Sequence, residues 1–179
     1  MGSTFLYIAD DAMYPCGGTE CHHCERQNVP IFTYFGHIVD AKLAKNPQLA
    51  EDEPDIDELC ADCILSGNVR KHLIDEITAT INRFAYDKTA ATEAYHRFPD
   101  IPLFMQYRDW PICCGDWCEF MGCPSAYEES KRIPNIHAYW ERGPVAWKSE
   151  FDLMPESLRE VSLFRCQECW RMWFTWQFT

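Results

Sequence analysis

The chain has 179 residues, a length that suits one domain or two small lobes sharing a core. Its formal charge of −12 argues against nucleic acid and anionic membrane surfaces as partners, because both attract basic proteins. The acidic charge suits a basic protein partner, although plain solubility accounts for it equally well. The first residues, MGSTFLYIADD, lack the basic region of a signal peptide, and no apolar run approaches the roughly 20 residues that span a bilayer. We therefore expect a cytoplasmic protein.

In the N-terminal half, residues 4–8 have the pattern of a short strand, and 31–39 are rich in β-branched and aromatic residues that predict a strand or hairpin arm. The acidic run at 51–58 is expected to be a solvated loop. Asn68 is placed to cap a helix whose apolar residues share one face. These residues are Leu73, Ile74, Ile77, Ile81 and Phe84.

Residues 85–100 are polar and are predicted to connect two lobes. The segment 103–114 has a strand-like composition, and we expect a turn at Gly115 that leads into a short helix over 116–122.

The C-terminal segment begins with 124–160, where four prolines predict mostly loop structure. Residues 161–165 are predicted to form a strand that enters a cysteine knuckle at 166–169. The chain then returns over 170–179 with an unbroken period of two, which predicts a strand with one buried face.

Most of the 11 cysteines lie in four short clusters along this framework. Thiols stay reduced in the cytoplasm, so CxxC spacing there favours a metal over disulfides. A structural zinc ion takes four nitrogen or sulfur ligands, commonly as two short pairs. The clusters are Cys21 with Cys24, Cys60 with Cys63, Cys113 with Cys114 and Cys118, and Cys166 with Cys169.

The first predicted zinc site pairs Cys21 and Cys24 with Cys60 and Cys63. A knuckle, a hairpin and a second cysteine pair before a helix together resemble a treble-clef zinc site. The two histidines inside the first knuckle, at 22–23, could replace one sulfur, but adjacent side chains there tend to point away.

The second predicted zinc site combines Cys166 and Cys169 with two of three sulfurs in the third cluster. Cys114 and Cys118 are the preferred pair because they span the expected turn and helix, and Cys113 is the alternative ligand. Two Zn²⁺ ions are therefore expected.

These predictions combine into an α+β fold in a small, zinc-stapled protein. We expect a single compact unit over 1–179, with a treble-clef-like N-terminal lobe at about 1–86 and a β-hairpin-rich C-terminal lobe at about 98–179.

Both predicted sites are ligated by sulfur alone, whereas a catalytic zinc keeps an open position. We therefore expect no catalytic residues and a non-enzymatic role. The alternative is a thiol- or zinc-dependent enzyme, an oxidoreductase or a hydrolase. The candidates for that role are Cys113, Cys114, Asp116, Glu119 and His137.

The cysteine blocks also resemble a known family. After a first CxxC, the order LCADCI (59–64), CGDWCEF (114–120) and LFRCQEC (163–169) is similar to that of the CbrC-like family of small bacterial proteins. The resemblance runs from about Phe5 to the C-terminus.

The chain departs from that family's pattern at three positions. Glu25 and Trp170 stand just after the first and last knuckles, where the family carries Gly, and Cys113 stands where His is common. The family's association with tolerance of a nuclease colicin implies an immunity or tolerance protein. Its partner would be a protein, such as a basic toxin domain.

Overall fold

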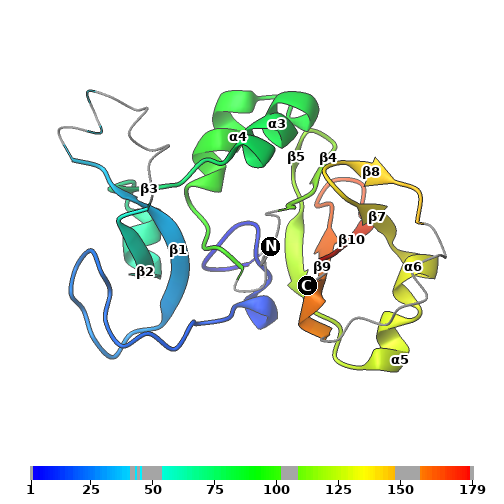
Figure 1. Cartoon of the computed structure of the whole chain (residues 1–179), viewed down its shortest axis with the longest axis horizontal. Coiled ribbons are helices and arrows are strands. Elements are labelled where there is room, and N and C mark those ends of the chain that lie inside the picture. The colour runs from blue at the N-terminus through cyan, green and yellow to red at the C-terminus, as the bar shows by residue number, and fades with distance from the viewer. Residues whose placement is uncertain are drawn as a thin grey trace. The chain divides into compact units, whose positions relative to one another are not determined.

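The computed structural model describes residues 2–40, 43, 45, 54–101, 109–147 and 158–177. Helices and strands are mixed along these segments, which confirms the predicted α+β class (Figure 1). Within the described residues, no helix is both long and apolar enough to cross a bilayer.

The chain divides into two compact units. Unit 1 consists of Met1–Met13, Glu76–Lys88 and Leu103–Thr179, and unit 2 consists of Tyr14–Asp75 and Thr89–Pro102. Each unit has its own sheet and its own cysteine group. The lobes expected from the sequence stay a prediction.

Unit 2 is built on a three-stranded antiparallel sheet in the order β2-β1-β3. Gly36 in β1 lies so close to the Arg70 carbonyl that a Cβ atom there would collide with it, which explains a glycine within the strand. The elements of this unit are β1 (Ile31–Ile38), β2 (Ile56–Cys60), α2 (Ala61–Leu65), β3 (Val69–Lys71) and α4 (Lys88–Tyr95). Between β3 and α4 the chain forms α3 (Asp75–Phe84), nearly all of which belongs to unit 1.

Three expectations for this part of the chain are resolved. The strand predicted at 31–39 is confirmed by β1. The helix expected to begin after Asn68 begins instead at Asp75, because the residues directly after Asn68 pair with β1 as strand β3. The polar stretch 85–100 contains α4, and the acidic run is partly strand β2, with 51–53 outside the described residues.

The core of unit 2 encloses a lysine. Lys71 is 1% exposed, and its ammonium lies 4.4 Å from the ring centroid of Tyr95 and 4.6 Å from that of Phe98. The Tyr34 ring is 5.5 Å away, and the buried Asp100 carboxylate is at 3.6 Å. Aromatic faces and a carboxylate together compensate for the water that this cation has lost.

Unit 1 is built on a five-stranded sheet in the order β6-β9-β10-β7-β8, in which only the β10–β7 pair is parallel, and on a small β4–β5 hairpin. The remaining elements are η1 (Asp10–Ala12), β4 (Ile112–Cys113), β5 (Asp116–Trp117), β6 (Glu119–Gly122), α5 (Tyr127–Ser130), α6 (Ile133–Ile136), β7 (Ala138–Trp140), β8 (Pro144–Val145), η3 (Leu158–Glu160), β9 (Val161–Arg165) and β10 (Met172–Trp176).

Two predicted elements of unit 1 are wrong. Residues 4–8 form a turn in which only Ile8 makes a β-bridge, because Ile8 N–H bonds back to the Phe5 carbonyl at 3.1 Å. The helix expected over 116–122 is strand instead, since β5 closes the hairpin with β4 and β6 pairs with β9.

The C-terminal strands are confirmed as β9 and β10, but the prediction of one buried face is wrong. Trp173, Phe174 and Thr175 are consecutive and all buried, because β10 lies inside the sheet and both of its faces are covered. The segment 124–160, expected to be mostly loop, contains short helices and strands as well. Residues 103–108 of the predicted strand at 103–114 lie outside the described residues.

The first prediction concerns the enclosed cation. Replacing Lys71 with Met leaves the Asp100 carboxylate buried without it, so the free energy of unfolding should fall by about 3–5 kcal/mol. The neighbouring Arg70 forms an exposed ion pair with Glu93 at 3.2 Å, and Arg70→Met should change that free energy by at most about 1 kcal/mol. The two variants are compared by urea unfolding. Equal losses of unfolding free energy would contradict a special role for the buried Lys71.

The second prediction concerns acid. Burial lowers the pKa of His96 to about 4, with help from the nearby Arg70 and Lys71 cations. The neutral ring accepts the Lys71 backbone N–H at Nδ1, at 3.1 Å. Between pH 6.5 and pH 4, His96 is protonated in the unfolded chain but stays neutral in the folded chain. The free energy of unfolding should therefore fall by about 3 kcal/mol as the pH is lowered to 4.

The matched variant is His96→Asn, which keeps an acceptor and does not titrate. Its urea midpoint, compared with that of the original chain between pH 7 and pH 5, should fall less steeply. Both proteins carry the same cysteines, so acid affects these alike. Parallel pH profiles would show that His96 does not supply the slope.

Candidate metal centres

Eight cysteines gather into two groups of four, one in each unit. In each group the sulfur atoms all lie within 4.8 Å of one another, so both could hold a metal ion. The first centre is Cys21, Cys24, Cys60 and Cys63. The second centre is Cys113, Cys114, Cys166 and Cys169.

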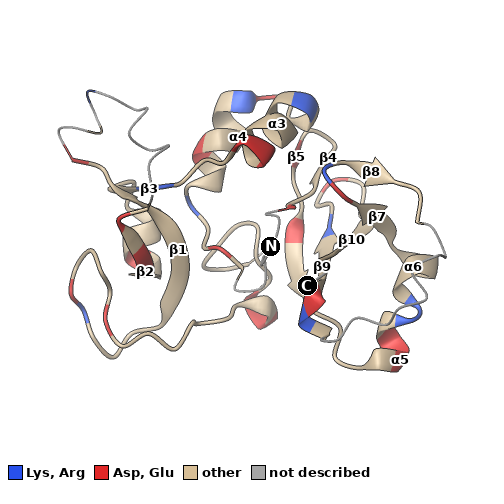
Figure 2. Ribbon diagram, in the orientation of Figure 1, with Lys and Arg blue, Asp and Glu red and all other residues tan. Residues whose placement is uncertain are grey.

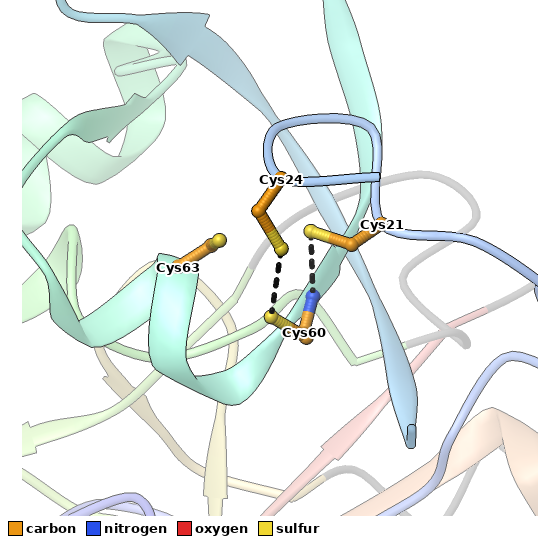
Figure 3. A group of neighbouring side chains, drawn as sticks. All are labelled: Cys21, Cys24, Cys60 and Cys63. Carbon is orange, nitrogen blue, oxygen red and sulfur yellow. Dashed lines mark hydrogen bonds between the residues drawn. The ribbon is translucent and has the colours of Figure 1, made fainter. Parts of the chain in front are cut away.

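The first centre joins a loop to a strand–helix junction. Cys21 and Cys24 lie on the loop before β1, Cys60 ends β2, and Cys63 lies in α2; their side chains point toward one another (Figure 3). Cys24 Sγ lies 3.8 Å from Cys60 Sγ, and the Cys60 backbone N–H donates to Cys21 Sγ at 3.4 Å. Cys24 is exposed and the other three are buried. This arrangement has the predicted order of knuckle, strand pair and helix, while the treble-clef likeness stays a prediction.

The first knuckle is a tight turn. Cys21 N–H donates to the Arg26 carbonyl at 3.0 Å, and Glu25 N–H donates to the Cys21 carbonyl at 2.8 Å. Glu25 has φ of 59°, in the left-handed region that glycine adopts most easily. A glycine at this position would adopt the turn with less strain.

The second knuckle repeats that turn. Cys166 N–H donates to the Arg171 carbonyl at 2.9 Å, and Trp170 N–H donates to the Cys166 carbonyl at 3.1 Å. Trp170 has φ of 61°, although it is a bulky residue. The two knuckles thus share one backbone geometry.

The second centre joins this knuckle to the β4–β5 hairpin. Cys113 ends β4, and Cys114 follows it in the turn with φ of 54°. Cys113 Sγ lies 3.7 Å from Cys169 Sγ, and the Cys169 backbone N–H donates to Cys166 Sγ at 3.5 Å. Cys166 is buried, Cys169 is exposed, and the other two are half-buried.

Cys118, a preferred ligand from the sequence, lies outside the second centre, and Cys113 stands in its place. An i, i+4 pair on a helix would have put Cys114 and Cys118 on one face. The segment forms strands β5 and β6 instead, and Cys118, which lies between them, is buried. There its carbonyl accepts the Trp110 indole N–H at 2.7 Å.

The histidines of the first knuckle are not members of its sulfur group. His22 Nδ1 lies 2.9 Å from the Asp57 carboxylate. His23 Nδ1 lies 3.3 Å from Cys63 Sγ, which makes it an outer neighbour of the first centre.

The other candidates for chemistry are engaged elsewhere. Asp116 accepts the Tyr7 hydroxyl at 2.9 Å. Glu119 is buried and pairs with Arg165 at 2.6 Å. His137 follows α6 and is not part of either cysteine group.

The pKa values of the thiols single out one sulfur in each centre. The Arg26 guanidinium lowers the pKa of Cys24 to about 6, and the Arg171 backbone N–H lowers that of Cys169 to about 7. Burial raises the pKa of Cys113 to about 12, and hydrogen bonding with Cys169 raises that of Cys114 to about 11. A divalent cation would lower the pKa of all four thiols in a centre, because it stabilises every thiolate bound to it.

The donor set fits a metal that prefers soft ligands and tetrahedral geometry, because four sulfurs converge as two pairs in each centre. A buried donor supports the fit. The Trp173 indole N–H has no acceptor within bonding distance, yet it lies near Cys113 and favours its thiolate form. A metal-bound thiolate at Cys113 would be the acceptor that this N–H lacks.

The third prediction separates Cys113 from Cys118. Cys113→Ser should lower the metal content to about one ion per chain after dialysis against a weak chelator, because a hydroxyl is a poor ligand for a soft metal. Cys118→Ala should keep the full content, since this buried thiol lies outside the centre. Elemental analysis gives the result, and the reverse pattern would restore Cys118 as the ligand.

Comparison with known sequences adds one finding. No curated protein and no solved structure matches the chain. One family's sequence model matches residues 16–178, a span that includes both cysteine centres. The chain belongs to this family, which is described as an uncharacterised protein family (UPF0167).

Proposed function

We propose that this chain is a zinc-stapled interaction protein with no enzymatic activity. The observation that carries the proposal is the pair of closed, four-sulfur groups, one in each compact unit. Zinc is the metal that best suits four thiolates supplied as short pairs in a structural role. A centre with four protein sulfurs leaves no open position for a substrate or a reactive water.

The partner in this proposal is a basic protein, such as the nuclease domain of a toxin, encountered in the cytoplasm. Asp and Glu outnumber Lys and Arg by 28 to 16, and they occur in both units (Figure 2). An acidic surface speeds association with a basic partner and disfavours competing anions. The resemblance to CbrC-like proteins, which are linked to colicin tolerance, also supports an immunity role.

The fourth prediction tests the metal and the partner together. The purified chain should contain about two zinc ions and should unfold when a strong chelator removes them. Cys60→Ser should destabilise unit 2, whereas Cys16→Ser should be nearly silent, because Cys16 lies outside both centres. A metal content of one ion or none, or another metal, would overturn the zinc assignment.

The partner is tested with a purified nuclease colicin domain, and with a basic protein that is not a toxin as the control. The toxin domain should form a stoichiometric complex whose dissociation constant rises with salt. Cells that express the chain should survive the toxin better than cells that do not. If the toxin domain binds no better than the control and gives no protection, the immunity role is wrong.

A further inference from the structure

The two knuckles provide an internal comparison, because an arginine stands two residues after the second cysteine of each. Arg26 follows Cys24, and Arg171 follows Cys169. Each arginine carbonyl accepts a hydrogen bond from the first cysteine of its own knuckle, at 3.0 Å and 2.9 Å respectively. The two side chains therefore start from equivalent places, but they reach different neighbours.

Arg26 turns onto its own centre. Its Nε donates to Cys24 Sγ at 3.5 Å, and its Nη2 donates to Cys60 Sγ at 3.3 Å. Nη2 also donates to the Asp62 carboxylate at 2.6 Å. Asp62 lies in α2 between the two cysteines of the second pair, so it holds the guanidinium against sulfurs from both halves of the centre.

Among the described residues, the Arg171 side chain makes no hydrogen bond to a sulfur of its centre. Its guanidinium lies over the Trp173 ring, 5.5 Å from the centroid. Asp116, which stands two residues after Cys114 as Asp62 stands after Cys60, accepts the Tyr7 hydroxyl instead. Among the described residues, the N–H groups beside the second centre are neutral backbone and indole groups, and none is a guanidinium.

This difference matters because a divalent ion with four thiolates carries a formal charge of about −2. A guanidinium that donates to two of the sulfurs compensates part of that charge and makes them less open to protons and other electrophiles. The second centre lacks this compensation, and three of its four sulfurs are exposed or half-buried, compared with one in the first.

We propose that Arg26 is a positioning residue that makes the first centre retain its metal, and that the second centre is the site at which this protein exchanges metal. The inference rests on the proposed function, since it requires both centres to hold zinc. In this proposal the first centre keeps its metal and stabilises the fold, whereas the metal of the second centre can be exchanged.

The fifth prediction is a release experiment on the full zinc-loaded chain. Excess EDTA removes the metal, and samples withdrawn over time are analysed for zinc that remains bound. Release should occur in two phases of equal amplitude. Cys169→Ser should remove the fast phase and leave the slow one, which identifies the fast phase with the second centre.

Arg26→Gln should speed the slow phase roughly ten- to a hundredfold, the usual effect of losing an outer partner of a ligand. Arg26→Lys keeps the charge without the planar fork and should fall in between. Arg171→Gln is the matched control and should leave both phases unchanged. A single phase in the original chain, or equal effects of Arg26→Gln and Arg171→Gln, would overturn the inference.

The absorption spectrum of the cobalt-loaded chain provides a second test. Replacing an arginine that only stabilises the fold would not change this spectrum. The sulfur-to-cobalt charge-transfer absorption should shift to longer wavelength in Arg26→Gln and stay in place in Arg171→Gln. An unshifted band in Arg26→Gln would overturn the positioning role even if release became faster. If the chain holds fewer than two metal ions, the proposed function fails instead, which keeps the two failures distinct.

Discussion

The need to bring thiols from distant parts of the chain to one point is the constraint on which the rest of this structure depends. Cys24 and Cys60 are 36 residues apart, and Cys113 and Cys169 are 56 residues apart, yet each pair of sulfurs lies within 3.8 Å. Four thiolates at these distances would repel one another, so a cation bound to all four would stabilise each group. A metal at each point would close long loops and stabilise a unit of modest size.

In unit 2 the cysteine centre and the buried ion pair occupy opposite ends of one sheet. Ile31 at the start of β1 pairs with Cys60, and Gly36 near its end pairs with Lys71. One end of β1 therefore meets the first cysteine centre, and the other meets the enclosed ammonium. The ammonium of Lys71 is balanced by Asp100, which comes from a distant segment.

Unit 1 uses the same backbone turn in another setting. Its knuckle joins β9 to β10, so the second centre is tied directly to a strand inside the main sheet. Trp173 follows the knuckle, where it is buried and meets both Arg171 and Cys113. The repeated turn thus comes with two different sets of neighbours, a cationic one around the first centre and a neutral one around the second.

The sequence by itself determined the local chemistry. The CxxC spacing identified the cysteine pairs, because two thiols at that spacing can chelate one ion. The strands at β1, β9 and β10 followed from β-branched and aromatic runs, and the α+β class followed from the mixture of patterns. The choice between Cys113 and Cys118 did not follow, since a run such as DWCEF suits either a helix or a strand.

Only the tertiary structure decided that choice, because β6 pairs with β9 and the segment is strand, with Cys118 buried. It also decided that Val69–Lys71 is a strand and that Lys71 is enclosed by rings from distant residues. The sequence also left open which neighbours the side chains of Arg26 and Arg171 contact, because neighbours such as Cys60 come from distant segments. Identical positions in two knuckles have identical local geometry, and only the neighbours supplied by the fold distinguish them.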